Sequence, residues 1–548
     1  MESRTLIARI VNAACIVALL AAAGAAAREV KFDIAKFEVR GNTLLPQARI
    51  DELLTPFTGK DKDYADVQRA LEALNNEYRR RNYGTVSVVV PEQELAGGVV
   101  VLQVTEGAIG KITISGNKYF DEDNIRASLP DLKEGGVPNL RKLSENTQLV
   151  NENPAKKVEV TLGAGEEAGQ VNARVDVAEE NPQRFYVTLD NTGTNDSGKD
   201  KIGVAYQHAN LFNRDQIVTL AYTTAIDAPG GVDSEVYSIG YRLPLYAWGD
   251  SIDFIYGNSN TNLPSVTPNL TNPLAINGKG KIIGLRYNHM FARSGLYTSK
   301  LVAGYDYKYF NNTCDIGGAG ALNGIAGCTP YTLQPLSLIY NGQWQKPGRG
   351  FDYNLGILYN AHPMGLEYPF PGGPGSPSDH YSAANGRQIK DKFAVWRLGG
   401  NYLQALGGDW LGHVGLTAQY SQDALPSPEQ LGLAGVNAVR GFSERAMVTD
   451  SGYVVNLELT TPDFASRLGA HGDLRGIFFY DFASGRNVDP AATINSFANI
   501  ASIGAGLRYN LKQDIAARFD LARVTDSGWS GTAERGDFLG HFSLVFGF

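Results

Sequence analysis

The chain has 548 residues, 43% of them hydrophobic, and a net charge of −8, so it is long enough for several domains or one large barrel. Its acidic charge balance is unlike that of nucleic-acid-binding proteins, and we expect no nucleic acid partner. Glycine (62 residues), tyrosine (27) and phenylalanine (23) are frequent, which favours many strands and turns.

Residues 1–27 predict a secretory signal peptide. Arg4 and Arg9 precede a short apolar stretch, Ile10 to Ala23, and Ala25-Ala26-Ala27 provides an A-x-A cleavage site. A transmembrane helix is the alternative, but the apolar stretch is too short for one. We therefore expect an exported protein whose mature chain begins at Arg28.

Two tandem β-α-α-β-β modules are expected next, at 28–107 and 108–182. Their first strands are similar, IAKFEVRGN from Ile34 and IGKITISGN from Ile109, and such internal similarity indicates a repeat. Helical periodicity and strand patterns then predict two helices and two strands in each module. The helices are expected at 46–54, 64–81, 121–129 and 140–151, and the strands at 85–90, 98–104, 157–162 and 170–177.

Residues 183–548 lose the helical periodicity and alternate between apolar and polar side chains. This pattern predicts a mainly β membrane protein with a transmembrane β-barrel, and an even strand number is usual in bacterial barrels. A soluble β protein is the less favoured alternative. We expect sixteen strands, near 183–193, 200–210, 215–226, 234–244, 250–260, 279–291, 296–311, 331–345, 349–361, 389–405, 410–423, 452–461, 473–483, 499–511, 515–524 and 537–548.

The connections between these strands alternate in length. Short periplasmic turns and long extracellular loops are typical of membrane barrels. One connection on the short side, 462–472, is longer and fits this pattern less well. The long connections include 261–278, 312–330, 362–388, 424–451, 484–498 and 525–536.

The two cysteines outside the signal peptide, Cys314 and Cys328, both fall in one of the long connections. Two cysteines fourteen residues apart in an exported chain predict a disulfide. A zinc site is the weaker alternative, because no histidine or further cysteine accompanies them. The seven histidines are scattered and no metalloprotease motif occurs, so we expect no metal, no cofactor and no enzymatic activity.

Several charged residues of the predicted strands alternate with apolar residues. A strand at 515–524 alternates apolar residues such as Phe519 with Arg518 and Asp520. An arginine on the lipid face near mid-bilayer costs about 2–4 kcal/mol, so the charged face must point inward. We expect these residues to be lumen charges: Glu458, Asp481, Arg508, Arg518 and Asp520.

The connection at 424–451 carries the sequence Val439-Arg440-Gly441-Phe442. An arginine between residues that favour burial is unusual in a solvated loop, and Gly441 permits a tight turn. We expect this loop to fold inward and Arg440 to dock on an acidic group; an ordinary surface arginine is the alternative. A similar tripeptide, Val39-Arg40-Gly41, is expected to end a strand instead.

With these features the chain resembles a known family. The two modules resemble POTRA domains, and a sixteen-stranded barrel with VRGF between strands eleven and twelve resembles the TpsB transporters of two-partner secretion, of the hemolysin secretion/activation type. The most specific segments are EQLGLAGVNAVRGF, from Glu429 to Phe442, and Phe479-Tyr480-Asp481. The resemblance implies that Arg440 pairs with Asp481 in the lumen; Ala483 stands where the family usually has glycine.

The resemblance also implies a function and partners. It implies an outer-membrane transporter of a Gram-negative cell, with periplasmic POTRA domains that recognise a large β-rich TpsA-like exoprotein, an adhesin or hemolysin, and a barrel that passes it to the surface. Whether the exoprotein is also activated stays open. The C-terminal Phe548 resembles the recognition signal for the barrel-assembly machinery, and outer-membrane lipid would surround the barrel.

Two alternatives and one departure accompany this interpretation. A barrel-assembly factor of the same superfamily would usually carry more POTRA domains, three to five against two here. A passive porin would lack both modules, and an outer-membrane enzyme should show a convergent catalytic cluster near the outer rim. Many family members carry an N-terminal helix that plugs the pore, whereas here the first strand begins within about seven residues of Arg28. We therefore expect pore closure to depend on the loop at 424–451 and on other loops.

Overall fold

The computed structural model describes residues 31–548 except 168, 195–196, 229–233, 261–279, 311–330, 361–388, 390–391, 491–495 and 529–532. The predicted signal peptide and the predicted disulfide between Cys314 and Cys328 therefore lie outside the described residues. The chain forms two compact units. The first comprises Met1–Lys111, Lys133–Leu140 and Gly163–Asn172, and the second comprises Ile112–Leu132, Arg141–Leu162 and Ala173–Phe548.

The first module packs two helices on a three-stranded sheet with the strand order β2-β5-β4. Tyr78 and Leu74 of helix α3 and Leu102 of the sheet are buried at its centre. α3 begins at a capping box, in which Asp63 accepts a hydrogen bond from the Asp66 backbone. The elements are β2 (Lys36–Arg40), α2 (Gln47–Leu54), α3 (Tyr64–Arg80), β4 (Val86–Val89) and β5 (Val99–Glu106).

A second, two-stranded sheet in the first module was not predicted. It joins β1 (Phe32–Ile34) to β3 (Gly59–Lys62). Both strands are short, and the sequence of β3, Gly-Lys-Asp-Lys, has none of the apolar alternation by which strands are recognised. The similar tripeptide near residue 40 ends strand β2, as predicted.

The second module repeats the order of the first. Its three-stranded sheet has the order β6-β8-β7. A glutamate at the end of the last strand holds the turn after the first strand in both modules: Glu106 accepts hydrogen bonds from the backbone of Thr43 and Leu44, and Glu179 from the backbone of Lys118 and Tyr119. The elements are β6 (Ala108–Ser115), α4 (Glu122–Ser128), α5 (Leu140–Val150), β7 (Lys156–Ala164) and β8 (Gln170–Glu179).

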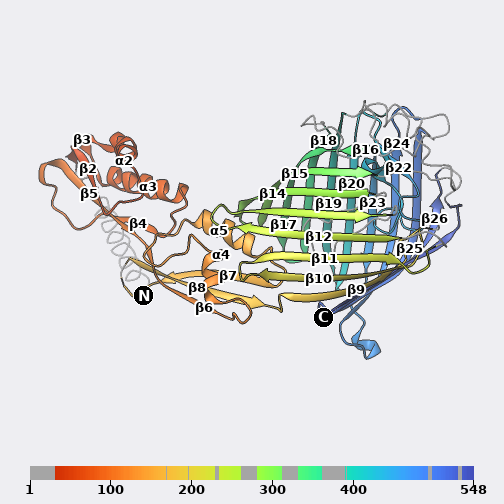
Figure 1. Ribbon diagram of the computed structural model, residues 1–548. Helices are drawn as coiled ribbons and strands as arrows, with labels where there is room; N and C mark the ends of the chain where they lie inside the picture. Colours follow the sequence, from red (N-terminus) through yellow and green to blue (C-terminus); the bar gives the residue numbers. More distant parts are fainter. Residues whose placement is uncertain are drawn as a thin grey trace, which may run out of the picture. The chain divides into compact units, whose positions relative to one another are not determined.

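The remaining strands close into an antiparallel barrel, whose wall of neighbouring strands is visible in Figure 1. β16 and β17 are separated by Gln334 alone and both pair with β15, so they form one interrupted strand and the barrel has the sixteen strands predicted. The strands are β9 (Gln183–Asp190), β10 (Lys201–Leu211), β11 (Gln216–Ala225), β12 (Glu235–Leu245), β13 (Asp250–Ser259), β14 (Gly280–Ser294), β15 (Tyr297–Phe310), β16 (Tyr331–Leu333), β17 (Pro335–Lys346), β18 (Arg349–Asn360), β19 (Phe393–Gly407), β20 (Trp410–Tyr420), β23 (Ser451–Thr460), β24 (Asp473–Arg486), β25 (Phe497–Leu511), β26 (Ile515–Asp526) and β27 (Phe538–Gly547).

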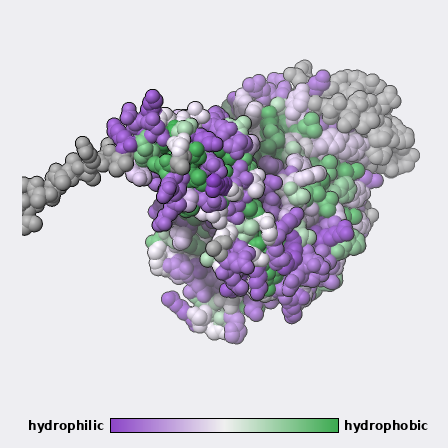
Figure 2. Space-filling view, turned by 90° about the vertical axis from the view of Figure 1, so that its left-hand side faces the viewer, coloured by the Kyte–Doolittle hydropathy of each residue, from purple (hydrophilic) through white to green (hydrophobic). Residues whose placement is uncertain are grey.

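The barrel wall is apolar outside and polar inside. On β24, Phe478 and Tyr480 are 54% and 41% exposed, whereas Asp481 on the other face is fully buried. Figure 2 shows green, hydrophobic surface on the barrel flank, bordered by hydrophilic surface. A closed barrel leaves no unpaired strand edge, so such a wall suits a hydrocarbon environment. None of the helices in the described ranges has the length and hydropathy needed to cross a membrane.

The barrel closes where β27 pairs with β9. The ladder at this seam has five pairs, from Ser543 opposite Asp190 to Gly547 opposite Tyr186. Phe548 extends it, because its backbone exchanges hydrogen bonds of 2.9 and 3.0 Å with Phe185. The predicted C-terminal signal residue is therefore part of the closing ladder.

Buried polar groups attach the second module to the short-turn end of the barrel. The Lys156 ammonium of β7 lies 2.7 Å from Asp215, in the turn between β10 and β11, and 2.8 Å from the Asn124 amide oxygen. Tyr246, between β12 and β13, donates a hydrogen bond of 2.6 Å to Asp215. Burial lowers the pKa of the Lys156 ammonium, and the Asp215 carboxylate opposes that shift.

Candidate functional site

The loop between β20 and β23 packs against the inner wall of the barrel. It contains a short hairpin of β21 (Leu431–Gly432) and β22 (Val448–Thr449). Val439 and Phe442, two residues of the predicted motif, are at most 1% exposed. They belong to one apolar cluster with residues of β23, β24, β25 and β26, which comprises Leu431, Leu433, Ala434, Val439, Phe442, Met447, Val454, Ala483, Ala498, Ile500 and Val524.

Arg440 forms a bidentate ion pair with Asp481 of β24. Its Nε lies 2.6 Å from Asp481 Oδ2 and its Nη2 lies 2.7 Å from Oδ1. Arg440 is 1% exposed and Asp481 is fully buried, so both charges are removed from bulk water. Parallel bonds between a guanidinium and a carboxylate are among the stronger charge-assisted hydrogen bonds, and they fix orientation as well as distance.

Other predicted lumen residues surround the same guanidinium. Glu458 Oε1 lies 2.8 Å from Arg440 Nη2, and Asp520 Oδ2 lies 3.8 Å from Nη1. The Phe479 ring lies beneath the guanidinium carbon at 3.5 Å from its centroid, a cation–π geometry. Three carboxylates and one aromatic face from three strands therefore enclose Arg440.

The two predicted lumen arginines, Arg508 and Arg518, both bind Asp520, and Arg518 also binds the loop. Arg508 Nη1 and Arg518 Nε lie 2.7 and 2.6 Å from the two oxygens of Asp520. Arg518 Nη2 also donates a hydrogen bond of 2.9 Å to the backbone oxygen of Val436 in the loop. The network thus joins the loop to β26 as well as to β24.

Gly441 allows the loop backbone to approach the wall closely. Its φ is +92°, and a Cβ at this position would lie 3.2 Å from the Ala522 side chain. Its backbone nitrogen donates a hydrogen bond of 3.1 Å to His541 Nε2 on β27. A side chain here would need both an unfavourable backbone conformation and a shift of the wall.

Three residues of the site were not predicted. His541 accepts from Gly441, and Asn456 donates bonds of 2.8 Å both to Asp481 and to the Ala438 backbone oxygen. Both lie on inward faces that the strand alternation already indicated, but alternation does not say which inward residues meet the loop. The third is Glu429, described next.

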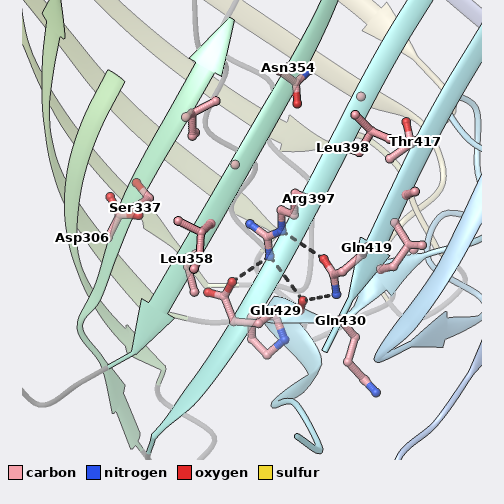
Figure 3. Close-up of a pocket in the computed structure, with 18 of the residues that line it drawn as sticks. Asp306, Ser337, Asn354, Leu358, Arg397, Leu398, Thr417, Gln419, Glu429 and Gln430 are labelled. Carbon is pink, nitrogen blue, oxygen red and sulfur yellow. Dashed lines mark hydrogen bonds and ion pairs between the residues drawn. The ribbon is translucent and has the colours of Figure 1, made fainter. Parts of the chain in front are cut away.

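Glu429 anchors the base of the loop to two other strands of the barrel, β15 and β19. It is 1% exposed, and its two oxygens lie 2.7 Å from Lys308 Nζ of β15 and 2.9 Å from Arg397 Nη2 of β19. Gln419 of β20 donates a hydrogen bond of 2.9 Å to the Glu429 backbone oxygen. Figure 3 shows Arg397 between the side chains of Gln419 and Glu429.

The arrangement is suited to holding a chain segment by charge pairing. In the part of the chain that the structure describes, no three His, Cys, Asp or Glu side chains are grouped as metal ligands. Of the other predicted site residues, Phe548 lies at the barrel seam, away from this network, and the two cysteines lie outside the described residues.

Comparison with known proteins identifies the family. The profile described as "Haemolysin secretion/activation protein ShlB/FhaC/HecB" matches residues 169–315 and 375–509, more than half of the chain. The chain belongs to this family. A profile described as "POTRA domain, ShlB-type" matches residues 32–107, and the POTRA profile "Surface antigen variable number repeat" matches residues 108–189.

Individual relatives agree with this assignment. The outer membrane transporter CdiB of Dickeya dadantii (strain 3937) is 25% identical over 422 residues, 76% of this chain and 69% of the relative. The hemolysin transporter protein ShlB of Serratia marcescens is 25% identical over 420 residues, 74% and 69% of the two chains. The solved structure of CdiB from Escherichia coli has the same fold, with a TM-score of 0.71 at 21% identity, covering 96% of this chain and 92% of that one.

The family assignment confirms several predictions. This ShlB/FhaC/HecB family member is an outer-membrane transporter of two-partner secretion, and it exports a partner exoprotein. Its barrel lies in the outer membrane and carries POTRA domains, and its family consists of transporters rather than enzymes. The alternatives of a passive porin, an outer-membrane enzyme and a barrel-assembly factor are therefore set aside.

Proposed function

We propose that the loop at 424–451 closes the resting pore and that the ion pair between Arg440 and Asp481 is its lock. The observation that carries this proposal is the enclosure of Arg440, a loop residue, by carboxylates from three different wall strands at 1% exposure. A segment that packs on the inner wall and fills part of the lumen must move before a protein can pass. Export then requires this network to open.

The size of the interaction suits a lock. Removing one member of a buried pair costs about 3–5 kcal/mol, because the remaining charge stays uncompensated. That cost corresponds to roughly a hundred- to several-thousandfold change in the balance between docked and undocked loop. The alternative role is structural, in which the pair stiffens β24 and has no part in opening.

Replacement of Arg440 separates these two roles. We expect Arg440→Ala to raise the open probability in planar-bilayer current recordings and to change the amount of exoprotein exported, since the loop tip loses its charge pair. Arg440→Lys keeps the charge but cannot bind bidentately, so it should fall between Ala and the parent. Arg523→Ala, at an exposed arginine on β26, is the matched control. Unchanged currents and export in Arg440→Ala would leave only the structural role.

We propose further that residues 28–107 and 108–182, released from a 1–27 signal peptide, capture the exoprotein before it enters the barrel at 183–548. The match of POTRA profiles to 32–107 and 108–189 supports this division. Capture by addition to a sheet edge is one established mode. On β4 the backbone nitrogen of Val88 is already bound to Asn75, so the β2 edge or a groove beside a helix is the better candidate.

We also propose two partners outside the export path. The barrel-assembly machinery would recognise the C-terminal strand that ends in Phe548, and outer-membrane lipid would contact the exposed aromatic and aliphatic residues of the wall. The exposed outer faces of β24 and β27 support this, with Phe478, Phe538 and Phe542 all exposed. The exoprotein itself would be a large β-rich protein of the TpsA kind.

A further inference from the structure

The loop leaves one side of the lumen hollow. A cavity of about 640 Å³ lies beside the base of the loop, between Glu429 and the inner faces of β15, β17, β18, β19 and β20 (Figure 3). The carboxylates of the Arg440 network lie instead on β23, β24 and β26. The cavity is of the size that usually binds ligands, and in a transporter it lies within the barrel that the exported chain must cross.

The walls of this cavity are rich in cations. Two carboxylates and four cationic side chains line it: Asp306, Glu429, Arg286, Lys308, Arg397 and Arg445. Arg286 is 2.6 Å from Asp306 and so is already paired on the wall. Lys308 and Arg397 both contact the Glu429 carboxylate, Lys308 also lies 3.8 Å from Asp306, and the Arg397 side chain remains 42% exposed. The side chains that line the cavity therefore carry more positive than negative charge.

Glu429 shows which chemical group the two cations bind. Each of its oxygens contacts a different cation, at 2.7 and 2.9 Å, so one carboxylate bridges Lys308 on β15 and Arg397 on β19. Both cations belong to the fixed wall, whereas Glu429 belongs to the loop. The bridging carboxylate therefore belongs to the loop, which is proposed to move during export.

We infer that Lys308 and Arg397 form a carboxylate-binding site on the export path, which Glu429 fills at rest and acidic side chains of the exported protein occupy during passage. This inference rests on the proposed movement of the loop. Withdrawing Glu429 alone would leave Arg397 without a carboxylate and Lys308 with only the more distant Asp306, 3.8 Å away. Exchange for a second carboxylate keeps both cations paired, so the client itself lowers the barrier to release of the loop base.

The test measures block of single-pore current by an acidic peptide. Hexaglutamate is added to the periplasmic side of the purified full-length transporter in a planar bilayer, and hexaglutamine is the neutral control. We expect hexaglutamate alone to block. Its half-blocking concentration should rise about tenfold in Arg397→Gln and in Lys308→Gln, and should fall by a similar factor in Glu429→Gln, in which the competing carboxylate is absent.

Controls separate this site from other sources of block. Arg523→Gln removes one positive charge from the outer face of β26 and should leave the block unchanged. Equal block by hexaglutamine, or equal half-blocking concentrations in the parent, Arg397→Gln and Lys308→Gln, would overturn the inference. Inorganic phosphate that competes as strongly as the peptide would assign the site to small anions instead of the client.

The same recordings keep this inference apart from the lock. Arg440→Ala reports on the loop tip, because the partners of Arg440 are on β23, β24 and β26 and do not line the cavity. A block that depends on Arg397 while Arg440→Ala leaves the current unchanged would uphold the carboxylate site and reject the lock. If the block does not depend on Arg397 but Arg440→Ala alters the current, the lock is upheld and the carboxylate site is rejected.

Discussion

At the scale of single residues, the resting loop is held by charge pairs at two points. Arg440 at its tip binds Asp481 on β24, and Glu429 at its base binds Lys308 and Arg397 on β15 and β19. The sequence indicated Arg440 because an arginine between apolar neighbours is out of place in a solvated loop. It gave no such sign for Glu429, since a glutamate in a polar stretch is ordinary.

Asn456 offers a graded test at this scale. Its amide nitrogen donates to both Asp481 and the Ala438 backbone oxygen, at 2.8 Å each, so it braces the carboxylate of the lock against the loop. Loss of a buried partner costs about 1–3 kcal/mol, less than loss of a buried charge. We expect Asn456→Ala to raise the open probability of the pore, but less than Arg440→Ala does.

The control for this change is Asn499→Ala, at an exposed asparagine on β25, two strands away in the wall. It should leave the current recordings unchanged. If Asn456→Ala behaves like this control, the amide has no part in holding the loop, and Asp481 is positioned by Arg440 alone.

At the scale of elements, every strand of the barrel was predictable within a few residues, because each must turn polar side chains inward and apolar ones outward. β1 and β3 were missed, since short polar strands lack that alternation. The joint between the second module and the barrel was also beyond prediction. Lys156 of β7 and Asp215 of the β10–β11 turn are 59 residues apart, and neither carries a local sequence signal.

Lys156 tests the importance of this joint. Lys156→Ala would leave the buried Asp215 carboxylate without its cation, and breaking such a pair costs about 3–5 kcal/mol. We expect the second module to loosen from the barrel, seen as faster trypsin cleavage between residues 112 and 182, while the barrel itself stays folded. Heat-modifiable migration on electrophoresis reports on the barrel separately.

Lys157→Ala is a matched control, because Lys157 is the adjacent lysine on the same strand and points away from Asp215. Its ammonium contacts backbone oxygens of the module instead. Equal protection of the module in Lys156→Ala and Lys157→Ala would show that the buried pair does not hold the joint.

At the scale of the whole molecule, the chain combines two POTRA modules with one membrane barrel, the organisation of a dedicated exporter. A cell without it should lose one exoprotein from the medium and keep its other outer-membrane proteins. Quantitative mass spectrometry of the culture medium and of outer membranes measures both. General depletion of outer-membrane barrels would point to a role in assembly instead, and the proposed role of the modules in client capture would have to change.

The sequence by itself determined the kind of protein: two repeated modules, sixteen alternating strands and an inward-folding loop with a buried arginine. These features are local, because the period of two in a strand and of 3.6 in a helix is written in neighbouring residues. Only the tertiary structure decided which inward residues meet. Glu429 and Lys308 are 121 residues apart, and Gly441 and His541 are 100 residues apart, so the register of the closed barrel brings each pair together.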